Sequence, residues 1–192
     1  MPKVSDDHRQ AQSDRFVDAA RRCFTRLGVE GTSMENIRTE AGVSAGLMYR
    51  YFASKDEMIR AAIAGSMAEF EVLAADAGQG EDIGGGLDFL RALLDRLRQF
   101  RCHTEGVDLF RLAVQGWAHA QTRPEAQAVV TASFARQLEI FRRAATRWTT
   151  PALAENAGQA IAAAVAGYIV LSAFSPVDID VDTYCAGLGS LA

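Results

Sequence analysis

The sequence predicts an all-α protein, with an N-terminal three-helix unit followed by a larger helical unit. The chain of 192 residues is 49% apolar and 23% charged, which suits a protein with a sizeable core. Helix-forming residues dominate, and no alternating β-branched run persists. Apolar residues instead recur at helical spacing along most of the chain, and three helix-start signals follow one another between residues 31 and 60.

The first helix is expected to begin near Arg15 and to end at Gly28. Its apolar positions follow a spacing of three and four residues, which is typical of a helix with one buried face. These positions are Phe16, Ala19, Ala20, Cys23, Phe24 and Leu27. Thr32 and Glu35 then have the spacing of a capping box, which predicts a second helix over residues 33–40.

A tight turn at residues 41–43 separates the second helix from a third. Gly42 can adopt the positive φ that ends one helix and redirects the chain, and Ser44 can cap a helix over residues 45–52. Two helices joined in this way form a helix-turn-helix, which places its second helix in the major groove of DNA. The alternative is a structural corner inside an ordinary all-α domain.

Ser54 and Glu57 form another capping box and open a long helix that continues to about Ala77. This helix is expected to join the two units. A glycine-rich stretch at residues 78–86 then interrupts the helical pattern. Helical spacing resumes in five further segments, namely 87–103, 106–120, 124–148, 151–174 and 183–191.

The stretch around the turn resembles the TetR (tetracycline-repressor-like) family of transcriptional regulators. The matching residues are Gly31-Thr32-Ser33, Ile37, Ala41-Gly42-Val43-Ser44, Gly46, Tyr49, Tyr51-Phe52 and Ser54-Lys55-Asp56-Glu57. The match is ordered and extends from Phe16 through Ile63. It implies a DNA-binding domain over residues 1–60 and a helical ligand-binding and dimerisation domain over residues 61–192.

The resemblance and the helix-turn-helix geometry together indicate two kinds of DNA contact. Phosphate contacts position a reading helix, whereas base contacts specify the sequence. The expected phosphate contacts are Thr32, Tyr49 and Lys55, and the expected base-reading residues are Ser44, Ala45, Gly46, Leu47, Arg50 and Tyr51. Ala45 and Gly46 offer no side-chain hydrogen bonds, so reading would depend on thymine methyl groups, close backbone approach, Arg50 or Tyr51. Tyr51 could instead be a packing residue.

The second unit is rich in large apolar residues with polar residues beside them, which is how small-molecule sites are usually built. We expect a pocket for a small, largely apolar effector of unknown identity. Its expected lining is Phe110, Arg111, Val114, Gln115, Trp117, His119, Phe134, Gln137, Phe141 and Tyr168. The alternative for the large apolar side chains is an ordinary packed core.

A single reading helix buries too little DNA surface for tight specific binding, so a homodimer on a two-fold operator in double-stranded DNA is expected. The segment 152–174 is rich in Ala and Gly, which permits close approach of a partner helix. Together with the C-terminal helix it resembles the dimer-forming four-helix arrangement of the family.

Other classes of function find little support in the sequence. Three widely spaced cysteines without CxxC spacing indicate neither a disulfide framework nor a metal site, and they suit a reducing cytoplasm. No signal peptide is indicated, and the most apolar run, residues 160–174, is too short for a membrane span of about twenty residues. No catalytic or phosphate-loop motif occurs, so neither an enzyme nor a cofactor is expected. A constitutive DNA-binding protein remains the alternative, and an activator is not excluded.

Overall fold

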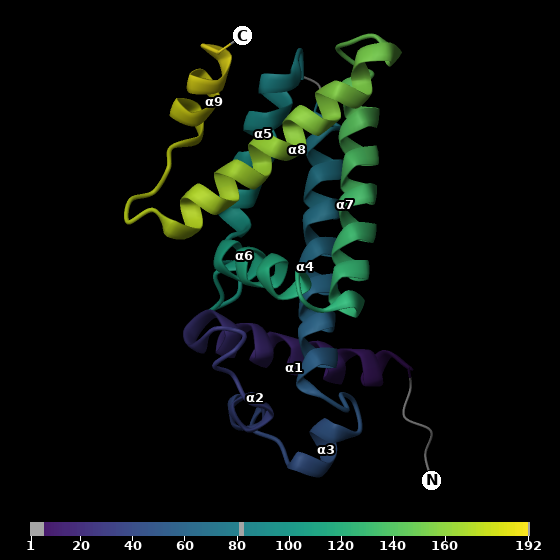
Figure 1. Cartoon of the computed structure of the whole chain (residues 1–192), viewed down its shortest axis with the longest axis vertical. Coiled ribbons are helices and arrows are strands. Elements are labelled where there is room, and N and C mark those ends of the chain that lie inside the picture. Colours follow the sequence, from purple (N-terminus) through teal and green to yellow (C-terminus); the bar gives the residue numbers. More distant parts are fainter. Residues whose placement is uncertain (1–5, 81–82, 192) are drawn as a thin grey trace.

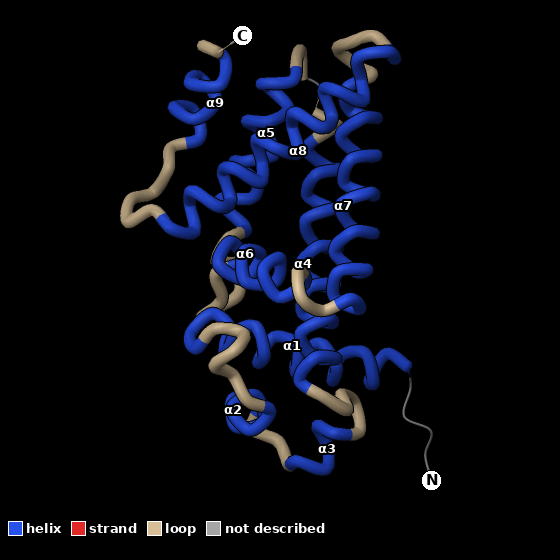
Figure 2. The backbone as a smooth tube through the Cα atoms, in the orientation of Figure 1, coloured by secondary structure: helices blue, strands red, loops and turns tan. Residues whose placement is uncertain are grey.

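The computed structural model describes residues 6–80 and 83–191, and within them the chain forms nine α-helices and no strand (Figure 1, Figure 2). The predicted all-α class is therefore confirmed. The helices are α1 (Asp6–Leu27), α2 (Met34–Ala41), α3 (Ala45–Tyr49), α4 (Lys55–Ala77), α5 (Gly86–Phe100), α6 (Leu109–Ala120), α7 (Pro124–Ala145), α8 (Pro151–Phe174) and α9 (Val181–Gly189). Two residues of the predicted glycine-rich break, 81 and 82, lie outside the described residues.

The helices form two parts, which we call the head and the body. The head consists of α1, α2, α3 and the first turns of α4, and the body contains the rest of α4 and helices α5 to α9 (Figure 1). α4 runs from one part into the other over 23 residues, a length of about 35 Å. The predicted domain boundary at residues 60 and 61 falls inside this continuous helix and stays a prediction.

The head has its own apolar core, and that core extends onto the body. Phe16 and Phe24 of α1, Ile37 of α2, Met48 of α3 and Met58 of α4 are each at most 1% exposed. The same cluster also includes Val107, before α6, and Leu112, within α6. The head therefore packs directly on α6 in addition to sharing α4 with the body.

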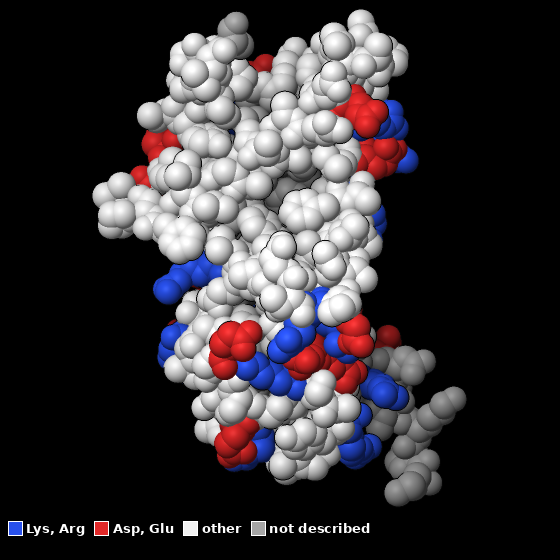
Figure 3. All heavy atoms as spheres, viewed as in Figure 1, with Lys and Arg blue, Asp and Glu red and all other residues white. Residues whose placement is uncertain are grey.

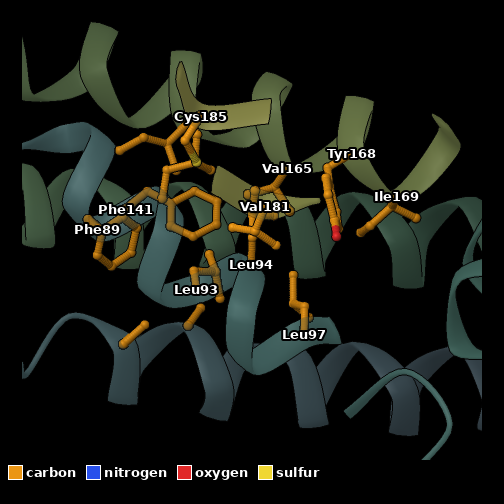
Figure 4. Close-up of a cluster of buried hydrophobic side chains, with 14 of the residues drawn as sticks. Phe89, Leu93, Leu94, Leu97, Phe141, Val165, Tyr168, Ile169, Val181 and Cys185 are labelled. Atoms are coloured by element: carbon orange, nitrogen blue, oxygen red, sulfur yellow. The ribbon is translucent and has the colours of Figure 1, made fainter. Parts of the chain in front are cut away.

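The core of the body is built where α5, α7, α8 and α9 meet (Figure 4). Phe89 and Leu93 of α5 lie against Phe141 of α7, and Tyr168 of α8 belongs to the same buried cluster. α4 and α7 run side by side along the long axis of the molecule, while α8 crosses them obliquely (Figure 1). α9 packs against α5 on the side of the body that lies away from α7 (Figure 1).

Small residues of α8 bring this helix close to its neighbours within the same chain. A side chain at Gly158 would meet the backbone nitrogen of Arg142 in α7 at 3.1 Å. A side chain at Gly167 would meet the Tyr184 hydroxyl of α9 at the same distance of 3.1 Å. Some of the small residues that the sequence analysis assigned to a dimer interface thus serve packing inside one protomer.

The structure corrects several predicted helix ends, and three of them lie in the head. α1 begins at Asp6, well before Arg15, and α3 ends at Tyr49 rather than Phe52. α2 is capped by Ser33 and not by Thr32: the Ser33 hydroxyl accepts from the Asn36 N–H at 3.1 Å. The Asn36 side-chain oxygen in turn accepts from the Ser33 N–H at 2.8 Å. The predicted pairing of Thr32 with Glu35 is therefore wrong.

α8 is the most apolar helix of the described chain. By length and composition, this helix of 24 residues could cross a membrane. The shorter apolar run at residues 160–174 did not indicate this. One such helix is weak support for a membrane span, because core helices of soluble proteins share these properties. In this fold α8 packs against α5, α6 and α7.

Candidate nucleic-acid interface and internal cavity

The turn between α2 and α3 has a fixed geometry. Gly42 adopts φ 66° and ψ 37°, a left-handed conformation that a side chain would strain. The Gly42 and Val43 N–H groups donate to the last carbonyls of α2, with the Val43 bond reaching Arg38 at 3.3 Å. The Arg38 guanidinium donates to the Val43 carbonyl at 3.0 Å. These contacts set the angle between the two helices of the helix-turn-helix.

An ion pair braces the same motif against α1. Glu40 of α2 accepts hydrogen bonds from Arg22 at 2.7 Å and from Arg26 at 3.2 Å. The Arg22 guanidinium holds the pKa of the Glu40 carboxyl below its ordinary value, so the carboxylate stays ionised at neutral pH. α2 is thereby fixed to α1 at its C-terminal end, next to the turn to α3.

α3 carries three of the six predicted base-reading residues, Ala45, Gly46 and Leu47, and it lies at the end of the molecule farthest from the body (Figure 1). Its start is fixed by the Ser44 hydroxyl, which accepts from the Leu47 N–H at 3.3 Å, and Met48 anchors the helix in the head core. The exposed members of the predicted set are Ser44, Ala45, Gly46 and Arg50, and Leu47 is half-buried.

Tyr51 departs from this group because its ring packs inward. The ring lies edge-on to Phe16 with centroids 5.2 Å apart, and the guanidinium carbon of Arg9 lies 6.0 Å from the Tyr51 centroid. This arrangement favours the packing role that the sequence left open for Tyr51.

Gly46 is exposed, and packing does not explain it. A β-carbon placed there would meet no atom within 4 Å of it, apart from its own helix backbone and its chain neighbours. Glycine inside a helix costs about 0.5–1 kcal/mol relative to alanine. Gly46 therefore leaves the backbone uncovered on the exposed side of α3.

The three predicted phosphate contacts differ in their surroundings. Tyr49 is 54% exposed at the end of α3. Lys55 lies in the first turn of α4, and its ammonium group donates to the Glu30 carbonyl at 3.1 Å. Thr32 is only 2% exposed and its hydroxyl donates to the Gly28 carbonyl at 2.7 Å. The Thr32 hydroxyl is therefore already engaged inside the head, and its phosphate contact stays a prediction.

A cavity of about 110 Å³ lies inside the body, between α4, α6, α7 and α8. Figure 3 shows the face of the molecule hollowed in the angle between α6, α7 and α8. Its wall is almost entirely apolar and carries several aromatic rings, including Trp117 and Phe134, whose centroids are 5.9 Å apart. Phe24, Val29 and Ile59 of the head form one end of the wall.

Half of the predicted pocket residues line this cavity. They are Phe110, Trp117, Phe134, Gln137 and Phe141. The other predicted residues, Arg111, Val114, Gln115, His119 and Tyr168, are not among the lining residues. Several residues of α4 do line it although they were not predicted, and Ser66, Met67 and Phe70 are examples. The apolar spacing along α4 carried that signal, but it was assigned to the connection between the two parts.

The remaining predicted residues have other partners. Gln115 contacts the head through Val29, and the His119 ring nitrogen lies 3.4 Å from the Glu30 carboxylate. The Tyr168 hydroxyl donates to the Ile179 carbonyl at 2.9 Å, and burial raises the pKa of that hydroxyl. Arg111 is exposed, and Val114 packs against the body core.

Across residues 6–80 and 83–191, no group of three His, Cys, Asp or Glu side chains is placed to hold a metal ion. Cys23, Cys102 and Cys185 are unbridged thiols, two of them buried.

Known proteins share both the sequence of the head and the whole fold. Residues 16–62 match the family described as bacterial regulatory proteins, tetR family. The chain is 31% identical over 148 residues to the HTH-type transcriptional repressor Rv1474c of Mycobacterium tuberculosis, and the match covers 74% of each protein. A solved TetR-like transcriptional regulator from Rhodococcus sp. RHA1 has a TM-score of 0.68 at 23% identity, covering 98% of this chain and 96% of that one. The multidrug binding protein EbrR, complexed with imidazole, has a TM-score of 0.65 at 21% identity, covering 94% of each chain.

A fixed helix-turn-helix corner with an exposed second helix defines a DNA-binding transcriptional regulator. The sequence match extends well beyond this corner into the body. The chain belongs to the TetR family, whose members are transcriptional regulators and not enzymes. Relatives that are named as HTH-type transcriptional repressors support a DNA-binding transcriptional repressor.

Proposed function

We propose that this repressor binds a two-fold DNA operator as a homodimer and leaves it when a small, largely apolar molecule enters the cavity of the body. The observation that carries the proposal is the composition of the cavity wall. Phe24, Val29 and Ile59 belong to the core of the head, and they also line the cavity. A molecule bound there would touch the DNA-binding part directly.

DNA recognition is assigned to α3 and its flanks. Ser44, Ala45, Gly46 and Arg50 are exposed on or beside α3, where base edges would be reached. Tyr49 and Lys55 are proposed to hold phosphates on either side and so to set the register of the helix on the duplex.

Dimerisation is assigned to α8, with α9 beside it. α8 carries an exposed stripe at helical spacing, which includes Ala160, Ala163, Val170 and Phe174. Phe174 is 75% exposed, and Glu155 is the one charged residue of the helix. Exposed apolar patches of this kind mark interaction surfaces, and a second copy would cover the stripe. Covering it also favours a soluble protein in the cytoplasm over a membrane span.

Effector release requires that the ligand prefer a state that is incompetent for DNA. A preference of about 1–3 kcal/mol lowers operator affinity about 5–150-fold. α4 provides the connection, because it lines the cavity with Ile63, Ser66 and Phe70 and continues into the head at Lys55. A shift of α4 would change the separation of the two reading helices in the dimer.

The test begins with selection of DNA fragments from the source genome that bind the protein. Genes beside those fragments indicate the class of metabolite, and such metabolites are then titrated against the protein–DNA complex. Sedimentation at micromolar concentration should show a species of twice 20.7 kDa. A monomer with and without DNA contradicts the dimer. If the protein is a dimer and no metabolite releases it from DNA, the result favours a constitutive DNA-binding protein. That alternative needs no cavity.

A further inference from the structure

Gln137 of α7 is a buried polar side chain without a protein partner. It is 7% exposed and lines the cavity, and among the described residues its amide makes no hydrogen bond. Ser133, one turn earlier on α7, is equally buried but accepts a hydrogen bond of 2.7 Å from Arg136. Buried side-chain atoms without a partner also occur in Gln12, Arg21, Glu69 and Ser172, but none of these residues lines the cavity.

A molecule that fills the cavity without pairing with the Gln137 amide costs free energy, because it removes water from the amide without giving it a hydrogen bond. The Gln137 amide offers two donors and an acceptor oxygen. A cavity needs about 10–15 Å³ to hold one water, so water could enter this space of about 110 Å³. Ser66, Gln137 and the indole N–H of Trp117 are the polar side-chain groups in the described wall, so such waters would find few partners. A ligand that fills the space and hydrogen-bonds to Gln137 covers the apolar wall and also gives the amide a partner.

The wall also restricts the charge and the size of the ligand. No Asp, Glu, Lys, Arg or His side chain is among the described lining residues, so a charged ligand would lose its hydration without an ionic partner. The rings of Phe70, Trp117 and Phe134 provide flat apolar surface. A cavity of about 150 Å³ accommodates a benzene ring, and this space of about 110 Å³ is partly open, so it admits a single ring whose substituent extends toward the opening.

We infer that the ligand of this cavity is a neutral, single-ring aromatic molecule with one hydroxyl or carbonyl group, which hydrogen-bonds to Gln137. Gln137 is accordingly the residue that selects the oxygen-bearing ligand over its hydrocarbon analogue. This inference rests on the proposed function only in taking the cavity as the effector site. An organic cation held by the aromatic rings is the competing ligand, and the missing carboxylate disfavours it.

Three probes that differ in one terminal group test the inference, namely benzyl alcohol, ethylbenzene and benzylammonium. Each is titrated calorimetrically against the full chain without DNA. Both neutral probes should bind, and benzylammonium should not. In Gln137→Leu the ratio of the Kd of benzyl alcohol to that of ethylbenzene should rise about tenfold, the effect of one lost hydrogen bond. Ser133→Ala, a buried polar change on the same helix away from the cavity, should leave this ratio unchanged.

Several outcomes would overturn the inference. They are failure of both neutral probes to bind, binding of benzylammonium as tight as that of benzyl alcohol, and an unchanged ratio in Gln137→Leu. Gln137→Met gives the same test if the leucine variant does not fold. DNA release by benzyl alcohol is measured separately. Selective binding without release would contradict effector control and leave the ligand assignment standing.

Discussion

The side-chain oxygen of Gln115 in α6 accepts a hydrogen bond of 2.7 Å from the backbone N–H of Val29, in the loop between α1 and α2. The amide nitrogen of the same side chain donates to the Phe24 carbonyl at 3.4 Å. α6 also lines the cavity through Gly116 and Trp117. One helix thus contacts the cavity and holds the head by direct hydrogen bonds, independently of α4.

Gln115→Leu should destabilise the head. The change leaves the N–H of the buried Val29 without its acceptor, a loss of about 1–3 kcal/mol. Urea unfolding and amide hydrogen exchange at Val29 measure the effect. Gln121→Leu is the matched control, because Gln121 is exposed at the end of the same helix and should change stability by less than about 0.5 kcal/mol. Equal stability of the two variants would contradict the assigned role of Gln115.

Lys55→Ala should weaken binding to all DNA sequences and flatten the salt dependence. Each phosphate contact contributes about 0.9 to the slope of log K against log salt, so the slope should fall by about one per subunit. Arg143→Ala removes an exposed cation from α7, far from the head, and should leave the slope unchanged. The phosphate assignment would be wrong if Lys55→Ala behaved like that control.

Gly46→Ala should stabilise the protein and impair DNA binding. The added methyl group meets no neighbouring atom, and the helix gains about 0.5–1 kcal/mol in thermal or urea unfolding. Operator affinity should fall, because the methyl group keeps the backbone of α3 away from the bases. If the variant is more stable but binds the operator as tightly as before, close approach of the α3 backbone to the bases does not contribute to recognition.

Phe174→Glu should dissociate the dimer. The substitution places a charge in the exposed apolar stripe of α8, where a partner copy would bury it without an ionic partner. Sedimentation velocity should then show the monomer. Val72→Glu is the control, since Val72 of α4 is 69% exposed but lies outside α8 and α9. Dissociation by both variants, or by neither, would argue against α8 as the interface.

The pH dependence of stability should include a contribution from Asp108, which caps α6 and pairs with Arg101 at 2.8 Å. Burial, the largest influence, raises the pKa of Asp108, but the Arg101 hydrogen bond and the N–H groups of Arg111 and Phe110 together outweigh it. The folded pKa therefore lies below the unfolded value of about 3.9.

A lowered folded pKa stabilises the protein above the unfolded pKa, and this stabilisation is lost as pH falls through the folded value. Asp108→Asn should cost about 1.5–3 kcal/mol at neutral pH, and the difference from the unmodified protein should shrink below about pH 4. Urea unfolding across this range measures it. Asp182→Asn, a carboxylate 78% exposed, should show a much smaller difference. A pH-independent cost for Asp108→Asn would contradict the charge effect.

Local sequence signals predicted the helices well, because capping and apolar periodicity act within one or two turns. They failed where two neighbouring residues could serve as the same cap. Thr32 and Ser33 are both suitable caps by type, and the nearby Gly28 carbonyl decides between them by engaging the Thr32 hydroxyl. Gly28 is only four residues before Thr32, but the bond depends on the turn that the chain makes at the positive φ of Gly28, which residue spacing alone does not reveal.

Only half of the predicted pocket residues line the cavity, because the sequence does not show which neighbour each face of a helix meets. Phe110 and Gln115 lie on one helix, but five residues turn a helix by about 140°, so the two side chains face different neighbours. Stricter use of helical spacing would have separated Gln115 from the aromatic face. One face of α6 meets the cavity and another meets the head. This assignment depends on how α6 packs, and the sequence alone could not predict it.

Ile59 and Ala62 of α4 belong to the head core and also line the cavity, whereas Gln137 and Phe134 of α7 line the cavity alone. A designer who changes effector preference at Ile59 or Ala62 therefore alters the reading head in the same step. Changes on α7 leave the operator-binding part intact. Retuning this repressor as a sensor for new molecules should accordingly proceed through α7 and α8, and natural diversification of ligand preference is under the same constraint.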